Sequence, residues 1–208
     1  MISISMIAGS DEAGKGDYFG YIAVACVCCE ENFLRKIGAR DSKTLSEKKI
    51  FELEKKIKEN CSYSVISISP QKYNELHKDS GGKYNLNEIL GWMHAKAIKE
   101  ILDKCGVERI LVDKFGKEEN VLRNLDKKLH EKIIFLTEGE KDPAVAAASI
   151  LARAEFLRKH AALSKKVGMA LPLGSTHVKD AGKQLIKKHG RAILREVAKL
   201  HFKITTEL

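Results

Sequence analysis

The sequence predicts an α/β fold in which a mixed sheet is covered by helices on both faces. Apolar, strand-like segments alternate with longer amphipathic segments along the chain. The first two strands are joined by a short glycine-rich turn and are therefore antiparallel, whereas helix-length segments separate the later strands, as parallel pairing requires. No repeat, low-complexity tract or linker interrupts this pattern. We therefore expect residues 1–208 to form one domain, with a C-terminal helical portion from about 165 to 208.

Composition and charge favour a nucleic-acid partner and no membrane. The 37 Lys and Arg residues exceed the 28 Asp and Glu residues, which gives a net charge of +9. This excess favours a polyanionic partner, with a solvated basic surface as the alternative. No stretch approaches the roughly 18 apolar residues of a membrane span, and the N-terminus lacks the basic start of a signal peptide. The five cysteines are odd in number and lie mostly within apolar runs, so we expect reduced thiols and a cytoplasmic protein.

A hairpin is predicted at the start of the fold. Residues 3–14 form an apolar run that ends in charged sequence, and residues 18–29 are almost wholly apolar. Glycines between the two runs supply the turn. Both segments are therefore expected to be neighbouring strands.

Two helices and a strand follow the hairpin. Residues 41–60 carry apolar side chains at helical spacing, with Ser42 or Thr44 as the N-cap. Residues 62–70 alternate between polar and apolar side chains, which predicts a strand closed by its final proline. Residues 86–106 form a long amphipathic helix ending at a glycine, in which we expect the single tryptophan to pack in the core.

The second half continues the alternation of strands and helices. Residues 109–113 and 132–140 are apolar runs that end among carboxylates, which predicts two strands. Residues 143–163 are alanine-rich and helical, with a proline suited to the first turn. Residues 178–202 predict one or two basic amphipathic helices, with a possible break at Gly190.

The first turn raises the question of a phosphate-binding P-loop, because residues 9–17 read "GSDEAGKGD". A P-loop needs Ser or Thr after its lysine to bind magnesium, and Gly16 has no hydroxyl. Asp11 and Glu12 would place two negative charges against the phosphates, and like charges at about 4 Å repel by several kcal/mol. We therefore exclude a P-loop.

Carboxylates at strand ends predict a metal site instead. Three apolar runs end in acids, which are Asp11 and Glu12, then Asp113, then Glu138, Glu140 and Asp142. Ligand sites of open α/β sheets lie at the carboxyl ends of the strands, so these acids are expected to converge. Their oxygens suit hard divalent cations, which would also neutralise the cluster. Acids at the centre of a basic chain predict phosphodiester cleavage with two metal ions about 4 Å apart.

The sequence also resembles the prokaryotic type 2 ribonucleases H, and ribonuclease HIII more than ribonuclease HII. The resemblance is carried, in chain order, by "GSDEAGKGDYFG", "RDSKTLSEKKI", "YNELH" with "NLNEILGWMHAKAI", "ILVDKFG", "AAASILAR" and "AKLHFK". It extends from about Ile7 to Phe202. The G-K-G loop followed by "DYFG", the "YNELH" and "NLN" pair and the "AKLHF" tail are HIII-like. Tyr21 departs from the pattern, because a proline usually follows "YFG".

This resemblance implies an RNase H-like mixed sheet flanked by helices, with a C-terminal helical extension. It implies endonucleolytic cleavage of the RNA strand of RNA–DNA hybrids with Mg²⁺ or Mn²⁺, two ions per site, leaving 5′-phosphate and 3′-hydroxyl ends. By motif match, the catalytic and metal-binding acids are Asp11, Glu12, Asp113 and Glu140. The spacing from "TEGE" to the alanine run is one residue shorter than the family pattern, so Asp142 and Glu138 remain open as the fourth acid.

The resemblance also implies substrate-binding residues. The loop Gly14-Lys15-Gly16 would read 2′-hydroxyls, and a bare hairpin turn is the alternative. Further candidates for contact with the hybrid are Lys43, Ser149, Arg153, Lys183 and Lys187, together with Lys188 and Arg191. Solvated side chains, or helix packing in the case of the alanine-rich helix, are the alternatives for these. The seven histidines show no ligand-like cluster in the sequence.

Two other functions compete with hybrid cleavage. Ribonuclease HII-like enzymes cut at single ribonucleotides embedded in duplex DNA, and a tyrosine in their C-terminal half helps to recognise the junction. No tyrosine follows Tyr84 here, which argues against that activity, and the full set of acids argues against a non-catalytic nucleic-acid-binding module. HIII enzymes typically carry an N-terminal substrate-binding domain. This chain begins eight residues before Gly9, so we expect that domain to be absent and the protein to be a monomer.

Overall fold

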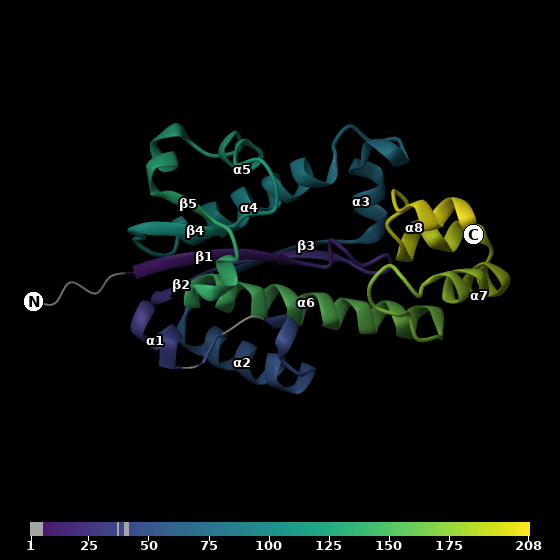
Figure 1. Ribbon diagram of the computed structural model, residues 1–208, viewed down its shortest axis with the longest axis horizontal. Coiled ribbons are helices and arrows are strands. Elements are labelled where there is room, and N and C mark those ends of the chain that lie inside the picture. The colour runs from purple at the N-terminus through teal and green to yellow at the C-terminus, as the bar shows by residue number, and fades with distance from the viewer. Residues whose placement is uncertain (1–5, 37, 40–41) are drawn as a thin grey trace, which may run out of the picture.

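The strands form one mixed sheet, as the ribbon in Figure 1 shows. The structure, a computed structural model, describes residues 6–36, 38–39 and 42–208. In this part of the chain, five strands lie in the order β3-β2-β1-β4-β5. Their bounds are β1 Met6–Ala13, β2 Ile22–Glu30, β3 Ser62–Ile68, β4 Arg109–Asp113 and β5 Ile133–Leu136. The pairs β1–β2 and β2–β3 are antiparallel, and β1–β4 and β4–β5 are parallel, which confirms the predicted sheet and hairpin.

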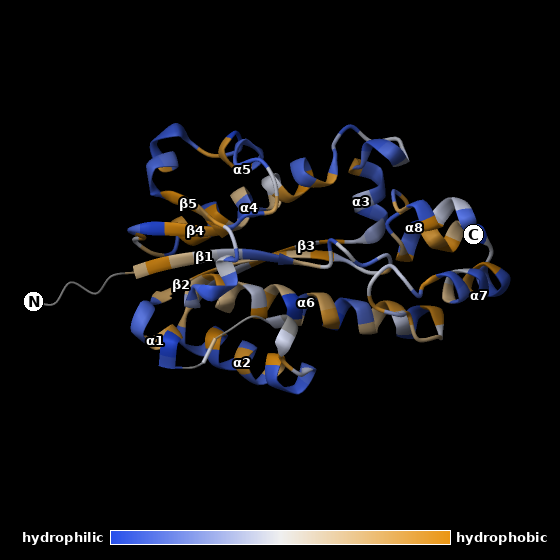
Figure 2. Ribbon diagram, viewed as in Figure 1, coloured by the Kyte–Doolittle hydropathy of each residue, from blue (hydrophilic) through white to orange (hydrophobic). Residues whose placement is uncertain are grey.

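Helices cover both faces of this sheet. Their bounds are α1 Glu31–Lys36, α2 Glu47–Asn60, α3 Pro70–Leu76, α4 Leu86–Leu102, α5 Glu119–Leu122, α6 Pro143–Val167, α7 Lys179–His189 and α8 Leu194–Val197. Figure 1 shows α4 and α5 over one face, α2 and α6 over the other, and α7 and α8 beyond one end of the sheet. Figure 2 shows apolar residues concentrated along the strands, while the outer turns of helices such as α2 are hydrophilic. The predicted α/β class is therefore confirmed.

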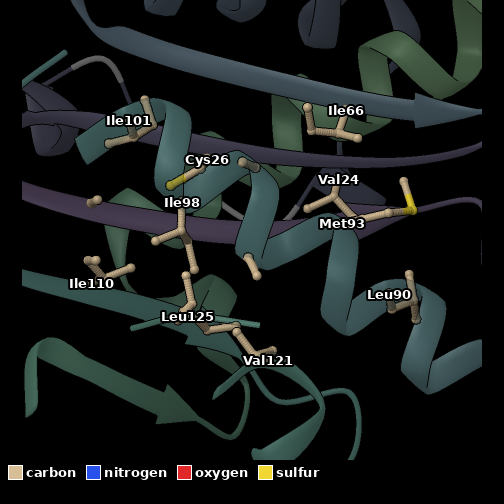
Figure 3. Close-up of a cluster of buried hydrophobic side chains, with 14 of the residues drawn as sticks. Val24, Cys26, Ile66, Leu90, Met93, Ile98, Ile101, Ile110, Val121 and Leu125 are labelled. Atoms are coloured by element: carbon tan, nitrogen blue, oxygen red, sulfur yellow. The ribbon is translucent and has the colours of Figure 1, made fainter. Parts of the chain in front are cut away.

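The core has one layer on each side of the sheet. On the α4 face, side chains of the strands and helix interlock, and Figure 3 shows Val24 and Cys26 of β2 beside Met93 and Ile98 of α4. On the other face, the alanine-rich side of α6 lies directly on β1 and β2. A Cβ atom at Gly9 would lie 2.1 Å from the carbonyl carbon of Ala144, so only glycine permits this approach. The start of α6 is thereby placed beside the end of β1.

Two helix starts differ from the sequence prediction. The N-cap of α2 is Ser46, whose hydroxyl accepts a hydrogen bond from the backbone N–H of Lys49 at 3.3 Å. The predicted caps Ser42 and Thr44 were wrong, because they lie in a separate 3-10 turn, η1 Ser42–Thr44. The proline after β3 does end the strand, but it also begins α3, a helix that the periodicity did not predict.

The helix α4 ends earlier than predicted and exposes its tryptophan. Its last residue is Leu102, four residues before the glycine expected to end it. Trp92 is 43% exposed, so its predicted place in the core was wrong, whereas the neighbouring Met93 is buried. The predicted break at Gly190 is confirmed, since this residue caps α7.

The C-terminal helices pack around the turn between β1 and β2. Tyr18 and Phe19 of that turn are fully buried against apolar residues of α7, α8 and the following segment. Phe19 forms an antiparallel bridge with Ala198. The C-terminal portion thus supports the turn that carries the glycine loop. Among the described residues, no helix is long and apolar enough to cross a membrane.

Candidate active site

The two adjacent acids of β1 face opposite sides of the sheet. Side chains alternate along a strand, and Ile7 packs on the α6 side while Ala8 packs on the α4 side. Asp11 therefore faces α6, and Glu12 faces α4. Each acid is met by a polar side chain from the helix on its own side.

Asp11 is held from the α6 side by a serine pair. Its buried carboxyl accepts a hydrogen bond from the hydroxyl of Ser149. The Ser149 hydroxyl lies 2.9 Å from the hydroxyl of Ser42. Ser149 has a single hydroxyl hydrogen, which it donates to Asp11. The hydrogen bond between the two serines is therefore donated by Ser42. Burial and then the neighbouring charge of Glu12 raise the pKa of Asp11 to about 8.

Glu12 is held from the α4 side by a histidine. Its side chain is only 2% exposed, and its Oε2 lies 3.2 Å from Nε2 of His94. Its other oxygen, Oε1, accepts a hydrogen bond from Nζ of Lys15 at 2.5 Å. Burial alone would raise the pKa of Glu12, but the hydrogen bonds and charges of His94 and Lys15 outweigh it, so the pKa is lowered. Glu12 is thus kept ionised.

Asp113 lies beside Asp11 at the carboxyl edge of the sheet. It ends β4, one residue beyond the last registered pair of the parallel strands, Ser10 opposite Val112. The backbone N–H of Gly139 donates to its Oδ1 at 2.8 Å. Burial raises the pKa of Asp113, the Gly139 N–H opposes this, and the charges of nearby acids raise the pKa further. The predicted convergence of the strand ends is therefore seen for the first three acids.

Of the three candidates for the fourth acid, Glu140 is the one whose charge acts on Asp113. It lies in the 3-10 turn η4 Gly139–Lys141, is half-buried, and is one of the charges that raise the pKa of Asp113. The two alternatives have other partners. Glu138 is exposed and pairs with Lys141 at 2.6 Å, and Asp142 is the N-cap of α6, accepting from the Ala144 N–H at 2.8 Å. The geometry favours Glu140 over both.

The donor set fits a hard divalent cation in its chemistry. All four acids offer oxygen ligands, and the ammonium of Lys15 already lies among them. Although partial burial alone would lower the pKa of Lys15, the charges of Glu12, Asp11 and Asp113 raise it. Within residues 6–36, 38–39 and 42–208, no three His, Cys, Asp or Glu side chains converge on a single point at metal-binding distance. In this arrangement the Lys15 ammonium is the cation in contact with Glu12.

The glycine loop is anchored to the C-terminal portion. The N–H of Tyr18 donates to the carbonyl of Gly174 at 2.8 Å, and the N–H of Gly20 donates to that of Val197 at 2.9 Å. The fully buried ammonium of Lys199 donates to the carbonyl of Gly20 at 2.9 Å. Burial lowers the pKa of Lys199 to about 7. These contacts leave Lys15 and Gly16 exposed, whereas Gly14 is buried.

Three of the residues predicted to contact the substrate differ from one another in their surroundings. Ser149 is buried, and its hydroxyl serves Asp11. The guanidinium of Arg153 lies over the ring of Phe156, 5.0 Å from its centroid. Lys43 belongs to η1, but its side chain lies outside the described part of the structure. Contact of these three residues with a hybrid remains a prediction.

The basic residues of the C-terminal portion divide into two kinds. Lys183 and Lys187 are exposed on α7. Lys188 donates to the carbonyls of Val167 and Gly168, each at 3.1 Å, and so caps the end of α6. Arg191 donates to the carbonyl of Thr205 at 2.9 Å. Lys183 and Lys187 are therefore better placed than the other two to contact a polyanion.

Three residues that hold the acids were missed from the sequence. They are Ser10, Ser42 and His94, and all are buried. A signal for His94 exists in hindsight, since it lies among the apolar residues of α4, and a buried polar side chain needs a partner. Nothing in the sequence indicates which partner that is.

Comparison with known proteins identifies relatives of this chain. The family model of ribonuclease HII matches residues 8–205. Ribonuclease HIII of Protochlamydia amoebophila is 41% identical over 207 residues, covering 97% of this chain and 68% of the relative. Ribonuclease HIII of Phytoplasma mali is 42% identical over 207 residues, covering 96% of this chain and 71% of the relative. The crystal structure of Bst-RNase HIII in complex with Mn²⁺ superposes with a TM-score of 0.89 at 30% identity, covering 100% of this chain and 70% of that one. The chain therefore belongs to the ribonuclease HII family, with the ribonucleases HIII among its relatives, and is a ribonuclease H.

Proposed function

We propose that this ribonuclease H cleaves the RNA strand of RNA–DNA hybrids by metal-dependent endonucleolytic hydrolysis, leaving 5′-phosphate and 3′-hydroxyl ends. The observation that carries the proposal is the meeting of Asp11, Glu12 and Asp113 at the carboxyl edge of β1 and β4, with Glu140 beside them. A buried group of acids in a chain of net charge +9 suits a cation at the centre and a polyanion around it.

The four acids are the residues that would hold Mg²⁺ or Mn²⁺. Two such ions, when bound, activate water and stabilise charge on the leaving oxygen. The protein orients two of these acids on the α6 side of the sheet: Ser149 orients Asp11, and the Gly139 N–H orients Asp113. Burial and then the charge of Glu12 raise the pKa of Asp11 to about 8, and a bound divalent cation would favour its ionised form.

The hybrid would be bound by the glycine loop and by α7. Gly14 has a φ of +89°, and a Cβ there would lie 2.2 Å from the carbonyl of Tyr21, so the tight turn depends on glycine. A Cβ at Gly16 would meet nothing within 4 Å, which leaves its backbone open to a ligand. We assign this loop to the 2′-hydroxyls, which distinguish RNA from DNA. Exposed Lys183 and Lys187 would contact the backbone phosphates.

Cleavage assays test this proposal directly. Three substrates are compared with Mg²⁺, with Mn²⁺ and with EDTA: a continuous RNA–DNA hybrid, a DNA duplex with one embedded ribonucleotide, and a plain DNA duplex. We expect cleavage of the continuous hybrid only with metal, with 5′-phosphate ends. Preference for the single ribonucleotide would instead support the HII-like activity. Hybrid binding without any metal-dependent cleavage would leave only a binding module.

A further inference from the structure

Within residues 6–36, 38–39 and 42–208, His94 is the only histidine whose side chain forms a hydrogen bond or ion pair with one of the four acids. Its ring, on the inner face of α4, is completely buried. Nε2 lies 3.2 Å from Oε2 of Glu12, and Nδ1 lies 2.7 Å from the hydroxyl of Ser10. The ring also stacks on Phe115, with centroids 4.8 Å apart and an interplanar angle of 12°. Both its position and its plane are thereby fixed.

The Ser10 hydroxyl ties this histidine to the sheet. It lies 3.0 Å from the carbonyl oxygen of Ala25 in β2, the neighbouring strand. Ser10 and Glu12 are two residues apart on β1, so both side chains point to the α4 face. His94 bridges them, and a continuous line of contacts runs from β2 through Ser10 and His94 to Glu12.

The two oxygens of Glu12 therefore have different surroundings. Oε2 is directed at the fixed imidazole, whereas Oε1 is directed at Lys15, which interacts with Asp11 and Asp113 as well. Lys15 is a flexible surface side chain, 44% exposed, and can move away from the acids. His94 has no such freedom. The imidazole thus holds one oxygen of Glu12 and leaves the other turned towards the remaining acids.

We propose that His94 is a positioning residue, which holds Glu12 by Oε2 so that Oε1 serves as the metal ligand. This inference rests on the proposed metal-dependent function. Residues that orient metal ligands typically change metal affinity or activity about 10- to 100-fold when removed. We expect an effect of that size, because Glu12 without His94 keeps only the partner that must leave when an ion binds.

The test compares two substitutions of nearly equal shape. His94→Met removes the hydrogen-bond donor, and His94→Gln retains one close to the position of Nε2. Ile101→Ala is the matched control, since this buried residue of the same helix stabilises the core without contacting an acid. Loss of its side chain is expected to lower the melting temperature and to leave metal affinity unchanged.

Mn²⁺ affinity of the protein alone is measured by the electron paramagnetic resonance signal of free Mn²⁺, alongside the Mn²⁺ dependence of cleavage. We expect His94→Met to weaken both about 10- to 100-fold, with hybrid binding in EDTA unchanged. His94→Gln should recover most of the loss. Equal loss in both variants would show that the donor is irrelevant, and would overturn the inference.

Asp11→Asn separates this inference from the proposed function. If Asp11→Asn loses Mn²⁺ binding while His94→Met keeps wild-type affinity, only the role of His94 is overturned. If the wild-type protein binds no Mn²⁺, the proposed metal site is overturned and the inference with it. If Ile101→Ala loses affinity as His94→Met does, the effect is one of stability, and the positioning role is again overturned.

Discussion

Replacing Asp11 with Asn should abolish cleavage and, without metal, stabilise the protein. The pKa of Asp11 rises from 3.8 in the unfolded chain to about 8 in the fold. Between these values the folded state retains a proton that the unfolded state has released, so stability falls as the pH rises. At pH 7 the difference spans about three pH units, which at 1.36 kcal/mol each is about 4 kcal/mol. Asn carries no charge and avoids this cost, while its Oδ1 can still accept from Ser149.

Urea unfolding in EDTA from pH 4 to pH 9 measures this effect, with the fluorescence of the single tryptophan and circular dichroism as probes. The stability gap between Asp11→Asn and wild type should be near zero at pH 4, grow towards about 4 kcal/mol at pH 7, and level off above pH 8. Adding Mn²⁺ should stabilise wild type alone. Parallel pH profiles, or a variant less stable than wild type at pH 7, would refute the reasoning. Turnover above a few per cent of wild type would refute the catalytic assignment.

Three further predictions concern the fourth acid, the exposed lysines of α7 and the buried Lys199. Glu140→Gln should abolish cleavage with little change in stability. Asp142→Ala should retain cleavage but lose about 1 kcal/mol of stability, because it removes the N-cap of α6. The reverse pattern in kcat and melting temperature would reassign the fourth acid. Replacing Lys183 and Lys187 by Gln should reduce the slope of log K against log salt for a hybrid by up to about two, and an unchanged slope would exclude both as phosphate contacts. Burial lowers the pKa of Lys199 to about 7, so between pH 7 and 10 only the unfolded chain binds the proton. Wild type should therefore gain stability by about 1.4 kcal/mol per pH unit in this range. Lys199→Met should lack this rise. Identical pH profiles in urea unfolding would contradict that last prediction.

The sheet and its acidic edge could be predicted because the signals are local. An apolar run followed by an acid indicates a buried strand ending at the surface, and this pattern placed Asp11 and Asp113 correctly at one edge. Their neighbourhood follows from the rule that parallel strands end on the same side. No such rule chooses among Glu138, Glu140 and Asp142. Their positions depend on where a 3-10 turn ends and where the next helix is capped, and these two points lie within a few residues of each other.

The support of the acids could not be predicted because it comes from distant parts of the chain. Ser42 and Ser149 are separated by 107 residues, and Ser10 and His94 by 84. Which side chains meet depends on how α4 and α6 are rotated over the sheet, and neither rotation is encoded in spacing alone. Trp92 shows the same limit, since one position along α4 separates a buried methionine from an exposed tryptophan.

The anchoring of the glycine loop by Gly174, Val197 and Lys199 has a consequence for biosynthesis. Translation delivers β1, β4 and the start of α6, and with them all four acids, well before these anchors leave the ribosome. The nascent chain can therefore gather its acids while the loop that we assign to the hybrid is still without support. The two come together only after residues 174–199 have left the ribosome. A chain that ends before residue 174 is therefore expected to retain all four acids without the contacts that support the glycine loop.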